Sequence, residues 1–189
     1  MKLSGRMLFF WLAVAVLFLD QITKSIMTAW LAPRRSLVVL PGLFDLSYVR
    51  NPGAVFGLFR SLADPWRSAL LTLVPMAAIF FVFRLASLIP RSRLRPLSAL
   101  GLILGGAVGN LVDRIRLGSV IDFLDVYLGR HHWPAFNVAD ACICTGVGLL
   151  LLEMWRSGDP IHEKTGARSG VSLTADSASV PELVKRGDP

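Results

Sequence analysis

The sequence predicts an α-helical integral membrane protein with four transmembrane helices and a small extracytoplasmic β-sheet. Two observations carry this prediction. Hydrophobic residues make up 53% of the 189 residues and charged residues only 17%, whereas about 25% of a soluble domain is charged. The apolar residues also gather in four stretches long enough to cross the roughly 30 Å of hydrocarbon in a bilayer, which takes about 20 residues as a helix.

The four apolar stretches predict membrane spans at residues 7–27, 66–89, 97–112 and 136–155. The first stretch resembles a secretory signal peptide because Lys2 and Arg6 precede it. A signal peptide ends in a small-residue cleavage site, but this stretch ends at Asp20 and Gln21. We therefore expect it to be kept as a helix.

Two of the connections between spans predict short strands. Residues 36–40 and 43–49 form two such segments joined by Pro41 and Gly42, a pair typical of turns. Residues 119–128 are rich in β-branched and aromatic side chains. A small sheet on the outer surface of the bilayer accounts for all three segments.

The chain divides into a membrane-embedded domain, residues 1–155, and a polar tail, residues 156–189. The tail beyond Trp155 has no aromatic residue and is rich in Ser, Gly, Asp and Pro, so we expect it to be disordered. An even number of spans places both termini on one side of the membrane. Basic residues are modestly more frequent on that side, which favours a cytoplasmic location for both termini.

The formal net charge of +7 could also indicate a nucleic-acid partner. The basic residues are scattered through loops and the tail, however, and no groove-reading motif is present. Orientation of the chain in a membrane explains the charge better, and we expect no nucleic-acid partner.

Polar side chains at membrane depth point to a functional site. A central Asp costs about 2.5–3.5 kcal/mol on insertion scales, yet five aspartates lie at or near the predicted outer ends of the spans, with three asparagines nearby. They are Asp20, Asp113, Asp122, Asp125 and Asp140, with Asn51, Asn110 and Asn137. One such Asp is explained by the water interface, but five on one face favour a polar site.

Helical spacing relates several of these residues. Asp20 and Lys24 are four apart, so they share a helix face and can form an ion pair. Small residues recur every four positions in the third span, at Gly101, Gly105 and Gly109, a pattern that lets helices approach closely. Gly106, Asn110 and Asp113 form the neighbouring stripe. Arg114 follows, and it could pair with a carboxylate, a lipid phosphate or a backbone carbonyl.

The spacing of Asp122 and Asp125 limits how a carboxyl pair can form. On a strand, residues three apart point to opposite faces, so only one of the two can face Asp140, and the spacing does not choose between them. Two carboxyl groups held together share one proton. The ionised member can then take a proton from water while the protonated member polarises a carbonyl, which is sufficient for peptide hydrolysis without a metal.

Four blocks of the chain resemble the bacterial lipoprotein signal peptidase family. They are DQITK (residues 20–24), NPGAVF (51–56), GNLVDR (109–114) continuing through Gly118 to VIDF (120–123), and FNVAD (136–140). The blocks occur in the family's order between Asp20 and Asp140, and their joint occurrence is highly specific. The resemblance does not extend to the tail beyond Trp155.

The resemblance implies an aspartyl endopeptidase of the bacterial inner membrane that cuts prolipoproteins just before a diacylglyceryl-modified cysteine. Asp122 and Asp140 match the catalytic pair, which leaves Asp125 outside it. Positions associated with substrate or inhibitor contact are Asn51, Gly53, Asn110, Arg114 and Asn137, and positions that support the site are Asp20, Lys24 and Asp113. The implied partners are lipidated prolipoproteins and membrane lipids. We expect a monomer with no metal and no cofactor.

Two other functions are weighed against this one. A metal-dependent lipid transferase would use Asp113, Asp122, Asp125 and Asp140 as cation ligands, but the chain has no compact multi-Asp motif. A proton-coupled transporter would use the carboxylates as a relay, but no inverted repeat is evident. His131 and His132 are interpreted as solvated residues of an outward loop.

Overall fold

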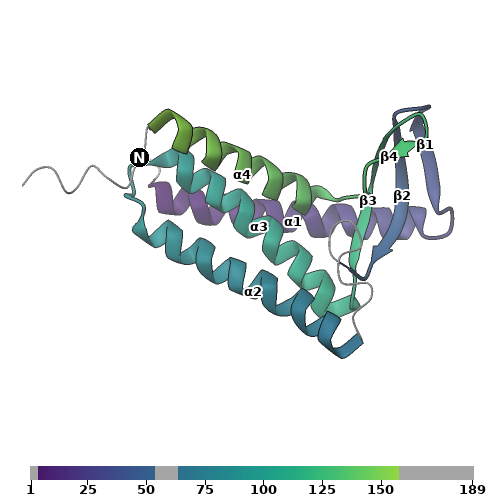
Figure 1. The fold of residues 1–189 in the computed structure, drawn as a ribbon, viewed down its shortest axis with the longest axis horizontal. Helices are drawn as coiled ribbons and strands as arrows, with labels where there is room; N and C mark the ends of the chain where they lie inside the picture. The colour runs from purple at the N-terminus through teal and green to yellow at the C-terminus, as the bar shows by residue number, and fades with distance from the viewer. Residues whose placement is uncertain (1–3, 54–63, 158–189) are drawn as a thin grey trace, which may run out of the picture.

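The computed structural model describes residues 4–53 and 64–157 of the chain. Four long helices form a bundle, and a small sheet lies at one end of it (Figure 1). The helices are α1 (Gly5–Leu31), α2 (Asp64–Leu88), α3 (Leu94–Leu117) and α4 (Val138–Ser157). All four are long and apolar enough to cross a membrane, so the prediction of four spans is confirmed.

The sheet is antiparallel, and its strand order is the order of the chain. Its strands are β1 (Ser36–Leu40), β2 (Phe44–Asn51), β3 (Val120–Leu128) and β4 (His131–His132). The turn between β1 and β2 holds Gly42 at φ +83°, a conformation that glycine adopts without steric cost. The first three strands confirm the sequence prediction. His131 and His132 are exposed, as the prediction of solvated residues expects, but they form a short strand that pairs with the end of β3 and do not lie in a loop.

Helix α3 is the centre of the bundle, since it packs against each of the other three helices. Its glycines make this possible. A methyl group at Gly105 would lie 2.5 Å from the carbonyl oxygen of Ala13 in α1, and one at Gly106 would collide with the carbonyl oxygen of Ala139 in α4. Glycines of the two neighbouring stripes therefore bring the backbones of α1 and α4 against different faces of α3.

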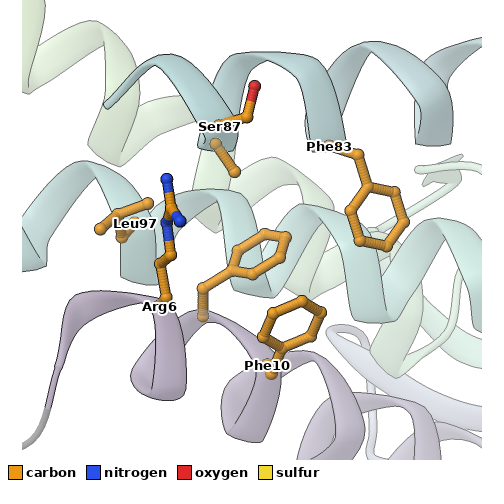
Figure 2. A pocket seen from close by; sticks show the side chains of 7 residues that line it. Arg6, Phe10, Phe83, Ser87 and Leu97 are labelled. Carbon is orange, nitrogen blue, oxygen red and sulfur yellow. The ribbon is translucent and has the colours of Figure 1, made fainter. Parts of the chain in front are cut away.

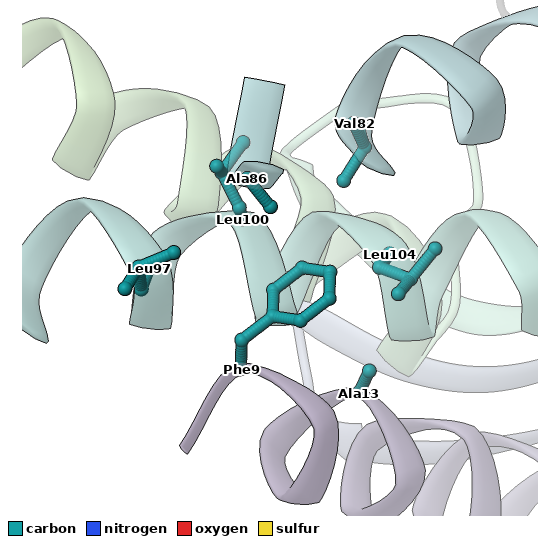
Figure 3. Close-up of a cluster of buried hydrophobic side chains, with 7 residues drawn as sticks. All are labelled: Phe9, Ala13, Val82, Ala86, Leu97, Leu100 and Leu104. Carbon is teal, nitrogen blue, oxygen red and sulfur yellow. The ribbon is translucent and has the colours of Figure 1, made fainter. Parts of the chain in front are cut away.

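The bundle has an apolar core at the end opposite the sheet. Side chains from α1, α2 and α3 meet there around Phe9 (Figure 3). The ring of Phe9 also contacts that of Phe83 edge to face at 5.9 Å. The buried members of this core are Phe9, Ala13, Val82, Ala86, Leu97, Leu100 and Leu104.

The end of α3 sets the position of the sheet. Gly118 ends the helix in the left-handed conformation, φ +68°, and its N–H donates to the carbonyl of Arg114 at 3.0 Å, as is common at helix C-termini. The chain then turns directly into β3, which pairs along β2 from Asn51 opposite Val120 to Phe44 opposite Val126. The start of β3 is thus held beside the last turns of α3.

The sequence-based division into residues 1–155 and 156–189 is only partly within the described residues. Arg156 and Ser157 complete α4. The remainder of the predicted tail lies outside the described residues.

Candidate active site

A buried ion-pair triad links α1 to α3 near the sheet. Lys24 Nζ lies 2.8 Å from Asp20 Oδ2 and 2.9 Å from Asp113 Oδ2, and each of the three side chains is at most 4% exposed. The predicted pair of Asp20 and Lys24 is confirmed. The second pair, with Asp113 of α3, was not predicted. One lysine therefore holds two carboxylates that would otherwise repel one another.

The two carboxylates of the triad also accept backbone hydrogen bonds from other elements. Asp20 Oδ1 accepts from the N–H of Ala139 at 3.0 Å, and Asp113 Oδ2 accepts from the N–H of Ile121 at 3.2 Å. The first bond satisfies an N–H of the first turn of α4, which has no partner within the helix. The triad thereby fixes the start of α4 and the start of β3 relative to α1 and α3.

Gln21 is a member of this network that the sequence analysis did not identify as a site residue. Its Nε2 donates to Asp113 Oδ1 at 3.0 Å and lies 3.2 Å from both Asp20 Oδ2 and the carbonyl oxygen of Gly109. A polar residue next to an aspartate inside an apolar span was the signal that could have identified it.

Asn137 forms a reciprocal cap with Asp140 at the N-terminus of α4. Its Oδ1 accepts from the N–H of Asp140 at 3.0 Å, and Asp140 Oδ2 accepts from the N–H of Asn137 at 3.3 Å. This is the arrangement of a capping box, with an acidic residue three positions after the cap. The positive end of the helix dipole also favours a carboxylate at this position.

The side-chain amide of Asn137 also contacts the second carboxyl group. Its Nδ2 lies 2.7 Å from Asp122 Oδ1, and 3.2 Å from both Asn110 Oδ1 and the carbonyl oxygen of Ile121. Asn137 is fully buried. One asparagine therefore bonds to Asp122 of β3 and to Asp140 of α4 and fixes the relative position of the two carboxyl groups.

Asn110 connects the ion-pair triad to Asp140. Its Nδ2 donates to Asp140 Oδ1 at 2.7 Å, and its Oδ1 accepts from Lys24 Nζ at 2.9 Å. Because an ammonium group can only donate, Lys24 fixes which end of the Asn110 amide faces Asp140. The lysine thus orients a donor toward a carboxylate that it does not itself contact.

Asp122 is 2% exposed and accepts a second bond from β2. Asn51 Nδ2 donates to Asp122 Oδ2 at 3.0 Å, and Asn51 Oδ1 accepts from the N–H of Gly53 at 3.0 Å. Burial raises the pKa of Asp122 from 3.8 to about 6; the hydrogen bond from Asn51 opposes the rise, and the charge of Asp140 adds to it. Asp122 thus holds its proton more tightly than an ordinary aspartate.

Asp125 lies on the other face of the strand, as the spacing predicted. It is opposite Asp45 in the sheet, and its Oδ1 lies 2.9 Å from Nδ1 of His132. Asp122, opposite Val49, points into the protein. Only Asp122 therefore joins the network that holds Asp140.

Arg114 is half-buried at the side of this cluster. Its guanidinium is close enough to interact electrostatically with Asp140, Asp122 and Asp113. The choice among a carboxylate, a lipid phosphate and a backbone carbonyl as its direct partner stays a prediction.

Asp122 and Asp140 are the two carboxyl groups that Asn137 links to one another. Asp113 is bound to Lys24, and Asp125 faces away, so neither joins Asp122 and Asp140 in a shared cation site. Within residues 4–53 and 64–157, no group of three or more His, Cys, Asp or Glu side chains is placed to hold a metal ion. The charge of Asp140 helps to raise the pKa of Asp122, and carboxyl groups that influence one another in this way are of the kind used in general acid–base chemistry.

Comparison with known proteins identifies the family that the chain resembles. The sequence profile of the family described as signal peptidase (SPase) II matches residues 12–156. A lipoprotein signal peptidase of Geobacter metallireducens is 54% identical over 142 residues, which are 74% of this chain and 85% of the relative. One from Syntrophotalea carbinolica is 42% identical over 158 residues, which are 84% of this chain and 97% of the relative.

The fold is also similar to that of a solved bacterial membrane enzyme. The two superpose with a TM-score of 0.69 at 26% sequence identity, over 82% of this chain and 92% of the other. A second solved bacterial membrane enzyme gives a TM-score of 0.66 at 27% identity, over 77% of this chain and 91% of the other.

Proposed function

The chain belongs to the signal peptidase II family of aspartic peptidases and cleaves signal peptides from prolipoproteins, and we propose that Asp122 and Asp140 are its catalytic pair. The observation that carries the proposal is the sharing of Asn137. The side-chain amide of this buried residue donates to the Asp122 carboxyl group, and its backbone N–H donates to the Asp140 carboxyl group, so a strand and a helix present a fixed pair.

The proposed reaction needs one proton on the pair. The ionised carboxylate takes a proton from a water molecule, whose oxygen attacks the scissile carbonyl carbon, while the protonated carboxyl group donates a hydrogen bond to the carbonyl oxygen. The carbon–nitrogen bond then breaks, and a proton passes from the pair to the departing amine. The raised pKa of Asp122, about 6, supports a pair that keeps one proton near neutral pH.

We assign the surrounding side chains to two roles. Asn110 and Asn137 are buried, and their amide groups bond to the aspartates, so they would chiefly position the pair. Asn51, Gly53 and Arg114 lie at its border and would contact the substrate. The triad of Asp20, Lys24 and Asp113 would support the site.

The substrate would be a prolipoprotein cut just before a diacylglyceryl-modified cysteine. The carboxyl pair lies where the helices meet the sheet, at one end of four apolar helices, which is the height of a bilayer surface. Acyl chains anchored in the hydrocarbon hold a scissile bond at that height, because each buried CH₂ contributes about 0.8 kcal/mol.

The protein is a multi-pass protein of the bacterial cytoplasmic membrane. We propose that both termini are cytoplasmic and that the sheet and the carboxyl pair face the opposite side, as the bias in basic residues favours. We also propose that the protein acts as a monomer.

The test is cleavage of a diacylglyceryl-modified prolipoprotein by the purified protein in detergent, with a chelator present. General acid–base catalysis contributes about 10²–10⁴-fold, so Asp122→Asn and Asp140→Asn should each lower turnover by about a thousandfold while the variants stay folded. Asp125→Asn is the matched control, since it removes a carboxylate from the other face of the same strand and should keep near-wild-type activity.

Two results would contradict the proposal. Substantial cleavage by folded Asp122→Asn or Asp140→Asn would exclude the two-aspartate mechanism. Loss of wild-type cleavage in the chelator would instead indicate a required metal ion.

A further inference from the structure

A second candidate binding site lies at the end of the bundle opposite the sheet. A pocket of about 220 Å³ opens there between the first turns of α1, the last turns of α2 and the start of α3 (Figure 2). The residues that matter for the argument are Arg6, Phe9 and Phe10 of α1, Phe83 and Ser87 of α2, and Leu97 of α3. None of them takes part in the network around Asp122 and Asp140.

One end of the pocket is polar and cationic. Arg6 points from α1 toward Ser87 of α2 (Figure 2). Ser87 Oγ donates to the carbonyl of Arg84 at 2.7 Å and accepts from the Arg84 guanidinium at 3.2 Å. The N–H of Gly5 donates to the carbonyl of Arg91 at 3.0 Å, which holds the start of α1 against the α2–α3 connection. Two guanidinium groups, of Arg6 and Arg84, are thus present at this end.

Among the described residues, no carboxylate neutralises this end of the pocket. Neither Arg6 nor Arg84 forms an ion pair with a described residue. Glu153, a described acidic residue in the last turns of α4, belongs to a helix that does not line the pocket. The pocket therefore has an excess of positive charge.

The other end of the pocket is aromatic and open to the bilayer. Phe10 and Phe83 are 53% and 43% exposed, with ring centroids 6.4 Å apart. Phe9 lies behind them, 2% exposed, and contacts both rings. A ligand that entered from the side would meet cations near the membrane surface and aromatic rings one turn deeper.

We propose that this pocket binds an anionic glycerophospholipid of the leaflet at that end of the bundle. The phosphate contacts the guanidinium group of Arg6 in the space beside Ser87, and the upper part of one acyl chain lies against Phe10 and Phe83. The volume is below the roughly 300–1,000 Å³ of pockets that enclose a drug-sized ligand, so the rest of the lipid stays in the bilayer. The proposal depends on the bundle spanning a membrane and does not depend on which residues are catalytic.

The test is native mass spectrometry of the full-length protein in detergent, titrated with phosphatidylglycerol or phosphatidylcholine of the same acyl chains. We expect one saturable phosphatidylglycerol adduct, bound about tenfold more tightly than phosphatidylcholine, because the choline cation offsets the phosphate charge and is repelled by the guanidinium groups. Arg6→Gln should weaken it about tenfold. Ser87→Leu should weaken it similarly without changing any charge, because the larger side chain fills the pocket.

The matched control is Arg95→Gln, which removes an exposed arginine from the same end of the bundle. Arg95 is two positions before Leu97, so the two point to different sides of α3, and its loss should leave the adduct unchanged. Equal weakening by Arg95→Gln, or full binding by folded Arg6→Gln and Ser87→Leu, would overturn the proposal in favour of diffuse surface attraction. If equimolar inorganic phosphate displaced the bound phosphatidylglycerol, the acyl chain would contribute nothing to binding, which would contradict the proposed contact with Phe10 and Phe83.

Discussion

The two ends of the helix bundle are held together by opposite chemistry. Phe9, in the apolar core, and Lys24, in the ion-pair triad, lie on the same helix and are each 2% exposed. Around Phe9 the contacts are between apolar side chains (Figure 3). Around Lys24 they are ion pairs and hydrogen bonds. Helix α1 therefore contributes to an apolar core near one end and to a buried polar network near the other.

The difference shows what a membrane protein must provide at each end. Lipid tails are as apolar as leucine, so the apolar end gains little from burial itself and depends on close packing around the glycines of α3. Polar groups at the other end have little water to bond with, so each needs a partner within the protein. The apolar end is specified by shape, and the polar end by charge and hydrogen bonding.

Charge at the polar end is not balanced if every carboxyl group is ionised. Asp20, Asp113, Asp122 and Asp140 lie close to two cations, Lys24 and Arg114. Like charges near one another raise the cost of ionising the last group. A proton held by the Asp122–Asp140 pair reduces that excess of negative charge. The same excess therefore favours a pair that keeps one proton, which acid–base chemistry requires.

The largest effect is expected from removing the cation of the polar end. Lys24→Met leaves Asp20 and Asp113 buried without a counter-ion, and breaking a buried pair typically costs about 3–5 kcal/mol. It also removes the group that orients Asn110 toward Asp140. We therefore expect a large fall in thermal stability and, below the melting temperature, at least a tenfold loss of prolipoprotein cleavage.

Leu100→Ala provides the comparison from the apolar end. Leu100 is 1% exposed in the core, and its truncation should cost about 2–5 kcal/mol through the cavity it leaves. Turnover by the remaining folded protein should nevertheless stay near wild type, because the site is not touched. If Lys24→Met kept full turnover, or Leu100→Ala lost it as severely, the two ends would not be separable in function.

The next effect concerns the packing that both ends share. In Gly105→Ala the new methyl group would lie 2.5 Å from the carbonyl oxygen of Ala13 and 2.7 Å from Cβ of Val16, and overpacking of this kind costs about 1–3 kcal/mol. Gly148 of α4 has no heavy atom within 4 Å of such a methyl group. Gly148→Ala should therefore be neutral or stabilising by up to about 1 kcal/mol.

Thermal unfolding of the two glycine variants in the same detergent measures this difference. Equal melting temperatures for Gly105→Ala and Gly148→Ala would show that α1 and α3 are not held at the close distance described here.

A third prediction uses the pKa of Asp122, which burial raises from 3.8 to about 6. The folded protein holds a proton that the unfolded chain releases between these values, so this group's contribution to stability is present at low pH and is lost as the pH rises through about 6. Asp122→Asn lacks this dependence. The melting temperature of the variant relative to wild type should therefore rise between about pH 4 and about pH 7.

The same group should appear in the activity profile. The dependence of kcat/KM on pH should be bell-shaped, with one limb near pH 6. Asp125→Asn is the control, and it should keep the wild-type limb. A flat profile from about pH 4 to about pH 8 would exclude a proton-sharing pair as the rate-determining apparatus.

The sequence predicts the apolar end and the helices well because their signals are local. Span length and hydropathy are read from consecutive residues, and the pair of Asp20 and Lys24 follows from helical spacing. The odd separation of Asp122 and Asp125 also predicts opposite faces. Local sequence does not decide which face of β3 points inward, since that depends on the register of β3 against β2.

The polar end was predicted less completely because its contacts join distant parts of the chain. The bond between Lys24 and Asp113 crosses from α1 to α3, and neither residue's neighbours indicate it. The capping box was missed for a smaller reason. The predicted fourth span began at residue 136, whereas α4 begins at Val138, which makes Asn137 the cap and places Asp140 three residues after it.

The smallest effect is expected at Gln21, at the border of the polar end. Gln21→Met keeps the side-chain length but removes the donor to Asp113 Oδ1 and its bonds to Asp20 and the Gly109 carbonyl. Asp20 and Asp113 keep Lys24 as a partner, so the loss should be about 1 kcal/mol of stability and a few-fold in turnover.

Thr23→Val is the control, because the described bonds of the Thr23 hydroxyl go to backbone carbonyls of its own helix, at 2.8 and 2.9 Å, and its loss should change neither quantity. Thermal unfolding and cleavage assays on both variants would place the boundary of the polar network. A Gln21→Met variant indistinguishable from Thr23→Val would put Gln21 outside it, and would leave the ion-pair triad alone as the support of the carboxyl pair.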